Sequence, residues 1–407
     1  MRRFIPDVFS NPTIRVSMVA ILIFGFAGAS TGPYASIIGI KEIGLSNVLY
    51  STLIFCAAAV NVTVSILLGN LADRVGGYRR IMMTVCLFGI AGYGSIYFLP
   101  SIATFVIGML LLVPVFNTLN ALLFANVRVV TNTMPRHEVS RVNTGVRSMI
   151  SLAWVLVPGL TGLVLTHSQS RLAAYLFAAL ACLSCLVLIS VYLPNQPKTE
   201  DAAANHLSHL AALTTVASPF VAMRIAALAF VTAMLHLNDA LLSLIATGQA
   251  QGAMTDVGIV IGIVALIEIV FMMIWAQVVR RKGPMVGLMA GGSIYATYLC
   301  LLSFAHQPWH LYALSLISGI GAAALISIPI TYLQDLLADR PGLGSALISV
   351  NIFVSAALSA LMFAVGTSLA GYASTALIGA VGGVSGLTAL ICLERRPRPL
   401  TTDWRAD

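Results

Sequence analysis

The sequence predicts an all-α membrane protein whose twelve transmembrane helices form two bundles of six. Three observations predict this fold class. The chain of 407 residues is 59% hydrophobic and 9% charged, whereas about a quarter of the residues in a soluble domain are charged. Apolar stretches long enough to cross a bilayer follow one another along the chain. Basic residues are concentrated in alternate loops, so the direction in which each stretch crosses the membrane can be predicted.

The twelve stretches are separated by charged residues or by proline and glycine. They are expected at about 14–40, 46–71, 81–99, 102–130, 138–166, 171–193, 219–248, 255–279, 284–305, 308–337, 342–370 and 373–393. The longest polar interruption lies near the middle of the chain, from Pro194 to Ser218. We therefore expect an N-terminal six-helix bundle at 1–193, a cytoplasmic linker at 194–218 and a C-terminal six-helix bundle at 219–407. Two similar halves around a midplane site are typical of transporters.

The basic residues predict the orientation of the chain. If the N-terminus is cytoplasmic, the residues on the inner side are Arg2, Arg3, Arg74, Arg79, Arg80, Arg136, Arg141, Lys198, Arg280, Arg281, Lys282, Arg340, Arg395, Arg396 and Arg398. Lys41 and Arg171 fall outside, as the positive-inside rule requires. Both termini are thus expected in the cytoplasm. The net charge of +8 reflects this bias and not a nucleic-acid partner.

The sequence lacks the motifs of the common enzyme classes. It contains no H-E-x-x-H, no phosphate-binding G-x-x-x-x-G-K and no G-x-S-x-G. All six cysteines lie within apolar stretches, and no His/Cys set has metal-ligand spacing. We therefore expect no catalytic residue, cofactor or metal. Since no nucleotide-binding loop is present, energy for transport would come from an ion gradient.

The segment GNLADRVGGYRR, between the second and third expected spans, resembles the signature loop of the major facilitator superfamily. Its matching residues are Gly69, Asp73, Arg74, Gly76, Arg79 and Arg80. The resemblance implies that Asp73 locks the cytoplasmic side by pairing with a basic neighbour and with the positive end of a helix near Leu343. A solvated turn is the alternative. The equivalent segment of the second half, AQVVRRKG, keeps the basic residues but lacks the acid.

Within that superfamily, the chain is similar to the sugar efflux transporters of bacteria. The passages that carry the resemblance are GVRSMISLAWVLVP (Gly145 to Pro158), NDALLSL (Asn238 to Leu244), ALIEI (Ala265 to Ile269) and TYLQDLLADRPG (Thr331 to Gly342). The resemblance implies export of a small polar solute, a sugar, by a monomer in the bacterial plasma (inner) membrane.

Three ionisable residues within the expected spans are candidates for proton coupling, because burying such groups in a membrane is costly. Glu268 stands twelve residues from both Asp256 and Arg280, so it lies about 18 Å from either flank, near the midplane. Apolar surroundings favour its neutral form, which would let it carry a proton; a structural hydrogen bond is the alternative. Asp239 and His236 share one helical face, and we expect Asp239 to lie towards the outer side.

Polar and aromatic faces predict the solute site. In the span 138–166, Arg147 and Trp154 lie on one face, and a tryptophan ring can pack on the apolar side of a sugar. In the span 102–130, Asn117 and Asn120 offer amides for hydroxyl groups, and Arg128, on the same stripe, is a gating candidate. Further binding candidates are Tyr34, Asn61, Gln334 and Asn351. The competing explanations are a purely structural ion pair for Arg147, packing for Trp154 and interhelical hydrogen bonds for the asparagines.

These features favour a secondary transporter that exports a sugar in exchange for protons, with two halves rocking around a central cavity. A multidrug or other metabolite exporter of the same fold is the alternative, since an acid within a cavity also suits a cation. A membrane-embedded enzyme or a sensor is less favoured, because neither clustered His and Asp residues at one interface nor a soluble domain is found in the sequence.

Overall fold

The computed structural model describes residues 11–75, 78–131, 134–168, 170–194, 219–336 and 341–395. Within these ranges the chain is helical, and twelve helices are long and apolar enough to cross a membrane, which confirms the expected number. The elements of residues 11–194, the N-terminal half, are α1 (Pro12–Thr31), η2 (Gly32–Tyr34), α2 (Ala35–Ile37), η3 (Ile38–Glu42), α3 (Asn47–Val75), α4 (Tyr78–Phe98), α5 (Ile102–Ile107), η4 (Gly108–Leu112), α6 (Val113–Asn117), α7 (Leu119–Thr131), α8 (Arg136–His167) and α9 (Ala173–Tyr192).

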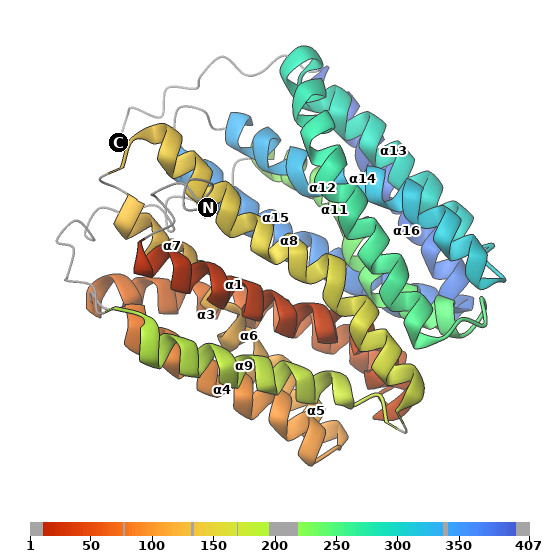
Figure 1. The fold of residues 1–407 in the computed structure, drawn as a ribbon. Helices are drawn as coiled ribbons and strands as arrows, with labels where there is room; N and C mark the ends of the chain where they lie inside the picture. The colour runs from red at the N-terminus through yellow and green to blue at the C-terminus, as the bar shows by residue number, and fades with distance from the viewer. Residues whose placement is uncertain are drawn as a thin grey trace, which may run out of the picture.

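Residues 219–395 form the C-terminal half. Its elements are α11 (Pro219–Thr247), α12 (Met254–Lys282), α13 (Pro284–Leu302), α14 (Pro308–Leu336), α15 (Pro341–Leu369) and α16 (Gly371–Glu394). Figure 1 shows the long helices running side by side, with the start of α1 and the end of α16 at the same end of the molecule. We call this the terminal end, and the opposite end the distal end. The predicted linker at 194–218 lies, except for Pro194, outside the described residues, so the division into two bundles stays a prediction.

Two of the membrane-crossing segments are not continuous α-helices. The first passes from α1 through a 3₁₀ turn (η2) that contains Pro33 and ends in the π-helical turn η3. The fourth contains the π-helical turn η4 just before Pro114. A proline lacks the N–H that an α-helix needs, and a π turn is one way of accommodating the missing hydrogen bond. These turns set the direction of the side chains that follow them.

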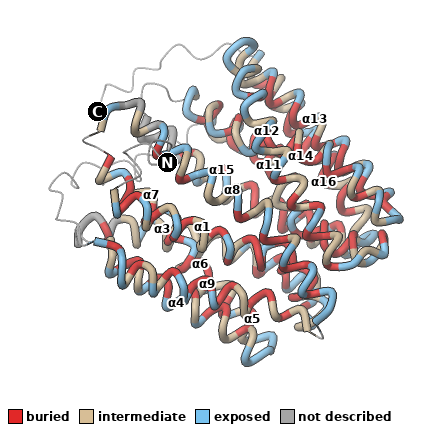
Figure 2. The backbone as a smooth tube through the Cα atoms, in the orientation of Figure 1, coloured by how far each residue is buried: buried red, intermediate tan, exposed pale blue. Residues whose placement is uncertain are grey.

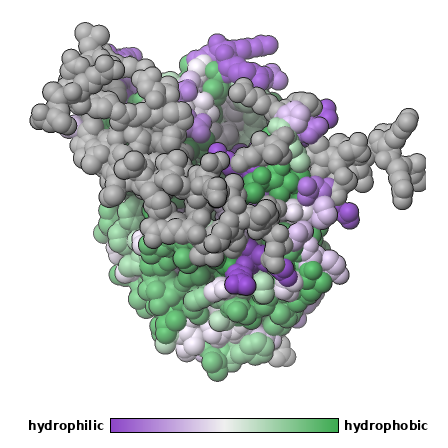
Figure 3. Space-filling model, turned by 90° about the vertical axis from the view of Figure 1, so that its left-hand side faces the viewer, coloured by the Kyte–Doolittle hydropathy of each residue, from purple (hydrophilic) through white to green (hydrophobic). Residues whose placement is uncertain are grey.

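The helices bury small and apolar residues against one another and expose large apolar residues on their outer faces. Buried positions are spread along the facing sides of the helices (Figure 2), whereas side chains such as Met273, Val381 and Leu67 are 60–72% exposed. Such a surface would be costly in water and suits a bilayer. Figure 3 looks onto the terminal end, where hydrophilic side chains gather while the described flanks below are mostly hydrophobic.

The two halves meet along two pairs of helices. α8 packs on α12 in the most extensive contact between two helices, and α3 packs on α15. Every hydrogen bond that joins the halves through two described residues lies towards the distal end, including Ser36 to Ser243 and Thr166 to Thr255. The distal end is therefore closed in this structure.

Candidate functional site

Acidic and phenolic side chains of α11, α12 and α13 gather in the C-terminal half, where Asp239 is exposed, Glu268 is half-buried and the two tyrosines, Tyr295 and Tyr298, are buried. Asp239 on α11 and Glu268 on α12 lie within electrostatic range of each other. Both also lie within electrostatic range of Tyr295 on α13. The hydroxyl of Tyr298 donates a 2.8 Å hydrogen bond to Oδ1 of Asn238. The two acids predicted to couple protons thus lie within electrostatic range of each other, on two different helices. Their role in proton coupling stays a prediction.

The polar face of α11 binds its neighbours instead of facing lipid. At one end, Oγ1 of Thr232 accepts a 3.2 Å hydrogen bond from Nδ2 of Asn351 on α15. At the other end, the hydroxyl of Ser243 lies 2.9 Å from that of Ser36 in the N-terminal half. His236, half-buried, lies between them on the same helix. Thr232 and Ser243 of the face recognised in the sequence therefore contact other helices, whereas Asp239 on the same face is exposed.

Asp239 also lies next to the contact between the halves. Tyr50 on α3 lies within electrostatic range of Asp239 and close to Ser36. The hydroxyl of Ser36 lies 2.9 Å from that of Ser243, which is one helical turn from Asp239. Asp239 thus lies one turn from a hydroxyl contact that joins the halves towards the distal end. Tyr50 and Ser36 could not be recognised as candidates from the sequence, because neither stands on a recognisable polar stripe.

The N-terminal half contributes polar residues from α3, α6, α7 and α8. The amide oxygens of Asn61 and Asn120 are buried and have no hydrogen-bond partner among the described residues, which is unusual for buried polar atoms. Asn117 and Arg147 are exposed, and Trp154 is half-buried. The ring of Trp154 lies against α1, where a Cβ atom added to Gly32 would stand 3.3 Å from it.

The remaining binding candidates lie elsewhere. Tyr34 is fully buried, and its hydroxyl donates a 2.7 Å hydrogen bond to the carbonyl oxygen of Pro158 in α8. Asn351 is 4% exposed and bound to Thr232. Gln334 is exposed near the terminal end of α14. None of these three is hydrogen-bonded to Trp154 or Asn120 among the described residues.

Around Tyr34, the backbones of α8 and α12 approach each other at glycines. A Cβ atom added to Gly258 would lie 2.2 Å from the carbonyl oxygen of Pro158, and one added to Gly262 would lie 2.7 Å from that of Val155. On the α8 side, a Cβ atom on Gly162 would lie 2.4 Å from the carbonyl oxygen of Met254. Each distance is too short for a real side chain, so the closure between the halves depends on these glycines.

The signature loop is described in part. The guanidinium of Arg79 donates a hydrogen bond to the carbonyl oxygen of Ser190 and so caps the end of α9. Gly69 has open space around it, and Arg80 and Arg128 are exposed at the terminal end. Gly76 and the side chains of Asp73 and Arg74 lie outside the described residues. The predicted lock around Asp73 therefore stays a prediction.

The twelve spans, the two halves and the internal acid pair point to one group of proteins. Residues 121–360 match the family described as Major Facilitator Superfamily. The chain belongs to this superfamily. It is therefore a transporter and not an enzyme.

Among curated proteins, Sugar efflux transporter A of Dickeya chrysanthemi is 26% identical over 387 residues, which cover 91% of this chain and 93% of that protein. Sugar efflux transporter A of Escherichia coli K12 is 26% identical over 349 residues, covering 84% and 86%. These relatives support the resemblance to sugar efflux transporters and a multi-pass place in a bacterial membrane.

Solved structures resemble the fold of the whole chain. The nucleoside transporter NupG superposes with a TM-score of 0.78 at 14% identity and covers 95% of this chain and 100% of its own. A peptide transporter POT in complex with sulfate gives 0.72 at 18% identity, with 94% of both chains covered. At these identities the likeness concerns the fold.

Proposed function

We propose that this protein exports sugars or sugar-like small molecules from bacteria in exchange for protons, by alternating access between its two halves. The observation that carries the proposal is that Asp239 and Glu268 lie within electrostatic range of each other, with Asp239 one turn from the Ser36–Ser243 contact between the halves. Two relatives named as sugar efflux transporters supply the solute class. In this proposal the terminal end is cytoplasmic and the protein works as a monomer.

The proton would act on the closure of the distal end. An ionised carboxylate needs water or a positive partner, whereas a protonated one can be enclosed at much lower cost. Asp239 stands one turn from Ser243, which bonds Ser36 across the halves. Protonation of Asp239 from outside would favour closure there, and a second acid at Glu268 would accept the proton on its way inward. His236 would assist as a relay on the same face.

The sugar would bind between the N-terminal residues and this acid pair. The unpartnered amide oxygens of Asn61 and Asn120 are acceptors for sugar hydroxyls. Trp154 would supply a ring face for the apolar side of the sugar. Arg147 would donate hydrogen bonds to sugar oxygens, and it would compete with protons for the carboxylates of Asp239 and Glu268. Further contributions to sugar binding are proposed for Asn117, Tyr34, Gln334 and Asn351. Gating is proposed for Gly69, Asp73, Arg74, Gly76, Arg79, Arg80 and Arg128.

The decisive experiment measures sugar-driven proton movement in proteoliposomes with an enclosed pH-sensitive dye. We expect the wild type to move protons when a sugar gradient is imposed. In Glu268→Gln and Asp239→Asn we expect the rate of proton movement to fall by about tenfold or more. Lys282→Gln, an exposed change at the terminal end, serves as the control. Full proton-coupled flux in both acid variants would refute the coupling assignment. Stronger competition by a lipophilic cation than by sugars would support the multidrug alternative.

A further inference from the structure

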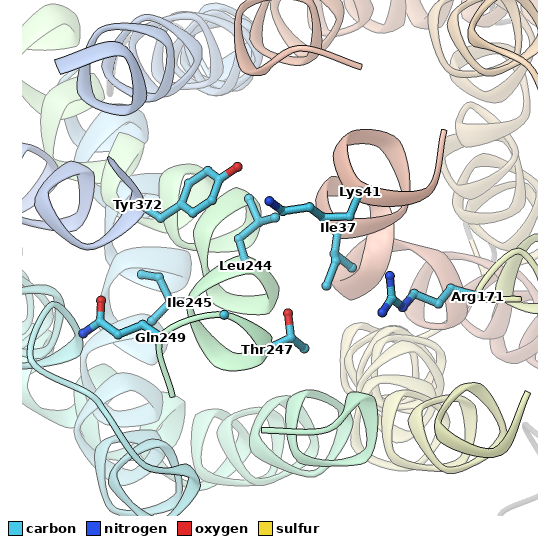
Figure 4. Close-up of a pocket in the computed structure, with 9 residues that line it drawn as sticks. Ile37, Lys41, Arg171, Leu244, Ile245, Thr247, Gln249 and Tyr372 are labelled. Carbon is cyan, nitrogen blue, oxygen red and sulfur yellow. The ribbon is translucent and has the colours of Figure 1, made fainter. Parts of the chain in front are cut away.

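A pocket lies between the two halves at the distal end, away from the acid pair. Its volume is about 340 Å³, within the range of small-molecule sites. The residues that line it are Ile37, Lys41, Arg171, Leu244, Ile245, Thr247, Gly248, Gln249 and Tyr372. Figure 4 shows Lys41 and Arg171 extending from the N-terminal half towards residues of α11 and α16. The pocket therefore exists only while the distal end is closed.

The two cations of this pocket are the two basic residues that the sequence analysis placed outside. Neither Lys41 nor Arg171 has an ion-pair partner for its side chain among the described residues. The Lys41 ammonium lies 5.9 Å from the centre of the Tyr372 ring, a weak interaction at an exposed position. Two cations that line one pocket, neither of them in an ion pair among the described residues, attract an anion.

The nearby carboxylate does not neutralise them. Glu42 accepts hydrogen bonds from the backbone N–H of Arg171, at 3.0 Å, and from the hydroxyl of Ser170. Its charge is thus directed at the start of α9 and not at the Lys41 ammonium or the Arg171 guanidinium. Glu42 lines an adjoining pocket of about 500 Å³ but does not line the first one, whereas Lys41, Arg171 and Thr247 line both.

The backbone that carries Lys41 is specialised. Lys41 belongs to the π-helical turn Ile38–Glu42 at the end of the first span, and single π turns are rare and often found at functional sites. On the opposite side, Gln249 is fixed by a 2.9 Å hydrogen bond from its Nε2 to the carbonyl oxygen of Ser303. The pocket therefore combines two cations, a hydroxyl and an amide with the apolar side chains of Ile37, Leu244 and Ile245.

We propose that this distal pocket binds a small organic anion, a carboxylate or phosphate on a compact and partly apolar body, and that the bound anion holds the distal end closed. The charged group would lie between Lys41 and Arg171, and the body would contact α11 and Tyr372. Since the two halves share the pocket, a ligand that fits it binds the closed state more tightly and shifts the population towards it. This effect on transport rests on the proposed alternating access, whereas binding itself does not.

The test uses purified full-length protein in a neutral, sugar-free detergent and measures its unfolding temperature by tryptophan fluorescence. The probe is glucuronate, and its uncharged methyl ester is the matched control. A second arm compares nanodiscs of phosphatidylcholine with nanodiscs that also contain phosphatidylglycerol, because a lipid headgroup could supply the same phosphate. Variants are Lys41→Gln, Arg171→Gln and their double, with Lys282→Gln and Arg281→Gln as exposed controls at the other end.

We expect glucuronate, but not its ester, to stabilise the wild type and both controls in a saturable manner. Each single variant should weaken apparent binding by about tenfold or more, and the double variant should lose it. The charge-preserving Lys41→Arg and Arg171→Lys should keep most of it, which separates a lost site from misfolding. Stabilisation by phosphatidylglycerol alone, lost in the double variant, would identify a headgroup as the source. If glucuronate stabilises the double variant as much as it stabilises the wild type, the proposal is overturned. It is also overturned if neither glucuronate nor phosphatidylglycerol stabilises the wild type.

Discussion

The hydroxyl of Tyr34 donates a 2.7 Å hydrogen bond to the carbonyl oxygen of Pro158, at the place where α8 comes closest to α12. Tyr34 follows Pro33 in a 3₁₀ turn, so the break in the first span points its ring at α8. The same carbonyl oxygen faces Gly258 of the other half. One atom thus connects the first span with the contact between the halves.

Tyr34→Phe should weaken distal closure without disturbing packing. Both residues belong to the N-terminal half, so the change acts through the carbonyl oxygen of Pro158, which loses its donor against α12 in the closed state but can accept from water when the end opens. This is expected to cost the closed state about 1 kcal/mol, roughly a fivefold change in the balance between closed and open states. The measurement is the distance between spin labels at His167→Cys and Gln251→Cys, exposed positions on opposite halves, in a background without the native cysteines. An unchanged distance distribution would show that the bond does not contribute to closure.

Gly258→Ala should open the distal end more strongly. The added Cβ atom would meet the carbonyl oxygen of Pro158 at 2.2 Å, and the backbones must separate to relieve it, at a cost of about 1–3 kcal/mol. The same pair of spin labels should report a larger population of long distances. Gly159→Ala is the control, because a Cβ atom there meets nothing within 4 Å. Similar behaviour of the two variants would contradict the role of the glycine contact.

Glu394→Gln should destabilise the C-terminal half at the terminal end. Oε1 of Glu394 lies 3.0 Å from Nε of Arg224, which is 2% exposed, and accepts a 2.8 Å hydrogen bond from Tyr332. Since Glu394 is itself partly exposed, we expect a loss of about 1–3 kcal/mol and a lower unfolding temperature. Tyr332→Phe should cost less, because the ion pair remains. A larger loss of stability in Tyr332→Phe than in Glu394→Gln would contradict this prediction.

Asp239→Asn mimics the protonated acid. Under the proposed cycle, this variant should no longer couple sugar flux to protons, yet it should still exchange labelled for unlabelled sugar, because exchange needs no change of protonation. Exchange and proton movement are measured in the same proteoliposomes. Loss of both activities, in a variant that unfolds at the wild-type temperature, would indicate that Asp239 holds the sugar instead of the proton.

Hydropathy and charge predicted the number of spans, because a membrane imposes length and polarity on each helix separately. The stripe around Asp239 was expected to face a cavity or a neighbouring helix, since a polar face towards lipid is too costly. Thr232 and Ser243 of this stripe do contact other helices. The proximity of Tyr50 to Asp239 could not be predicted, because it depends on how two distant helices cross.

The glycines of the distal contact show the same limit. The pair Gly258 and Gly262 has the four-residue spacing that Gly28 and Gly32 also have. Only the structure shows that Gly258 meets a backbone oxygen of the other half while Gly28 has open space beside it. Spacing indicates that close approach is possible, but the partner decides whether it occurs.

The bonds that join Ser36 to Ser243 and Thr166 to Thr255 are between neutral hydroxyl groups. When such groups separate into water, each exchanges one neutral partner for another, so little free energy is needed to part them. Under the proposed cycle, a contact built this way would open easily, and one proton or one bound solute would suffice to decide which way the protein faces.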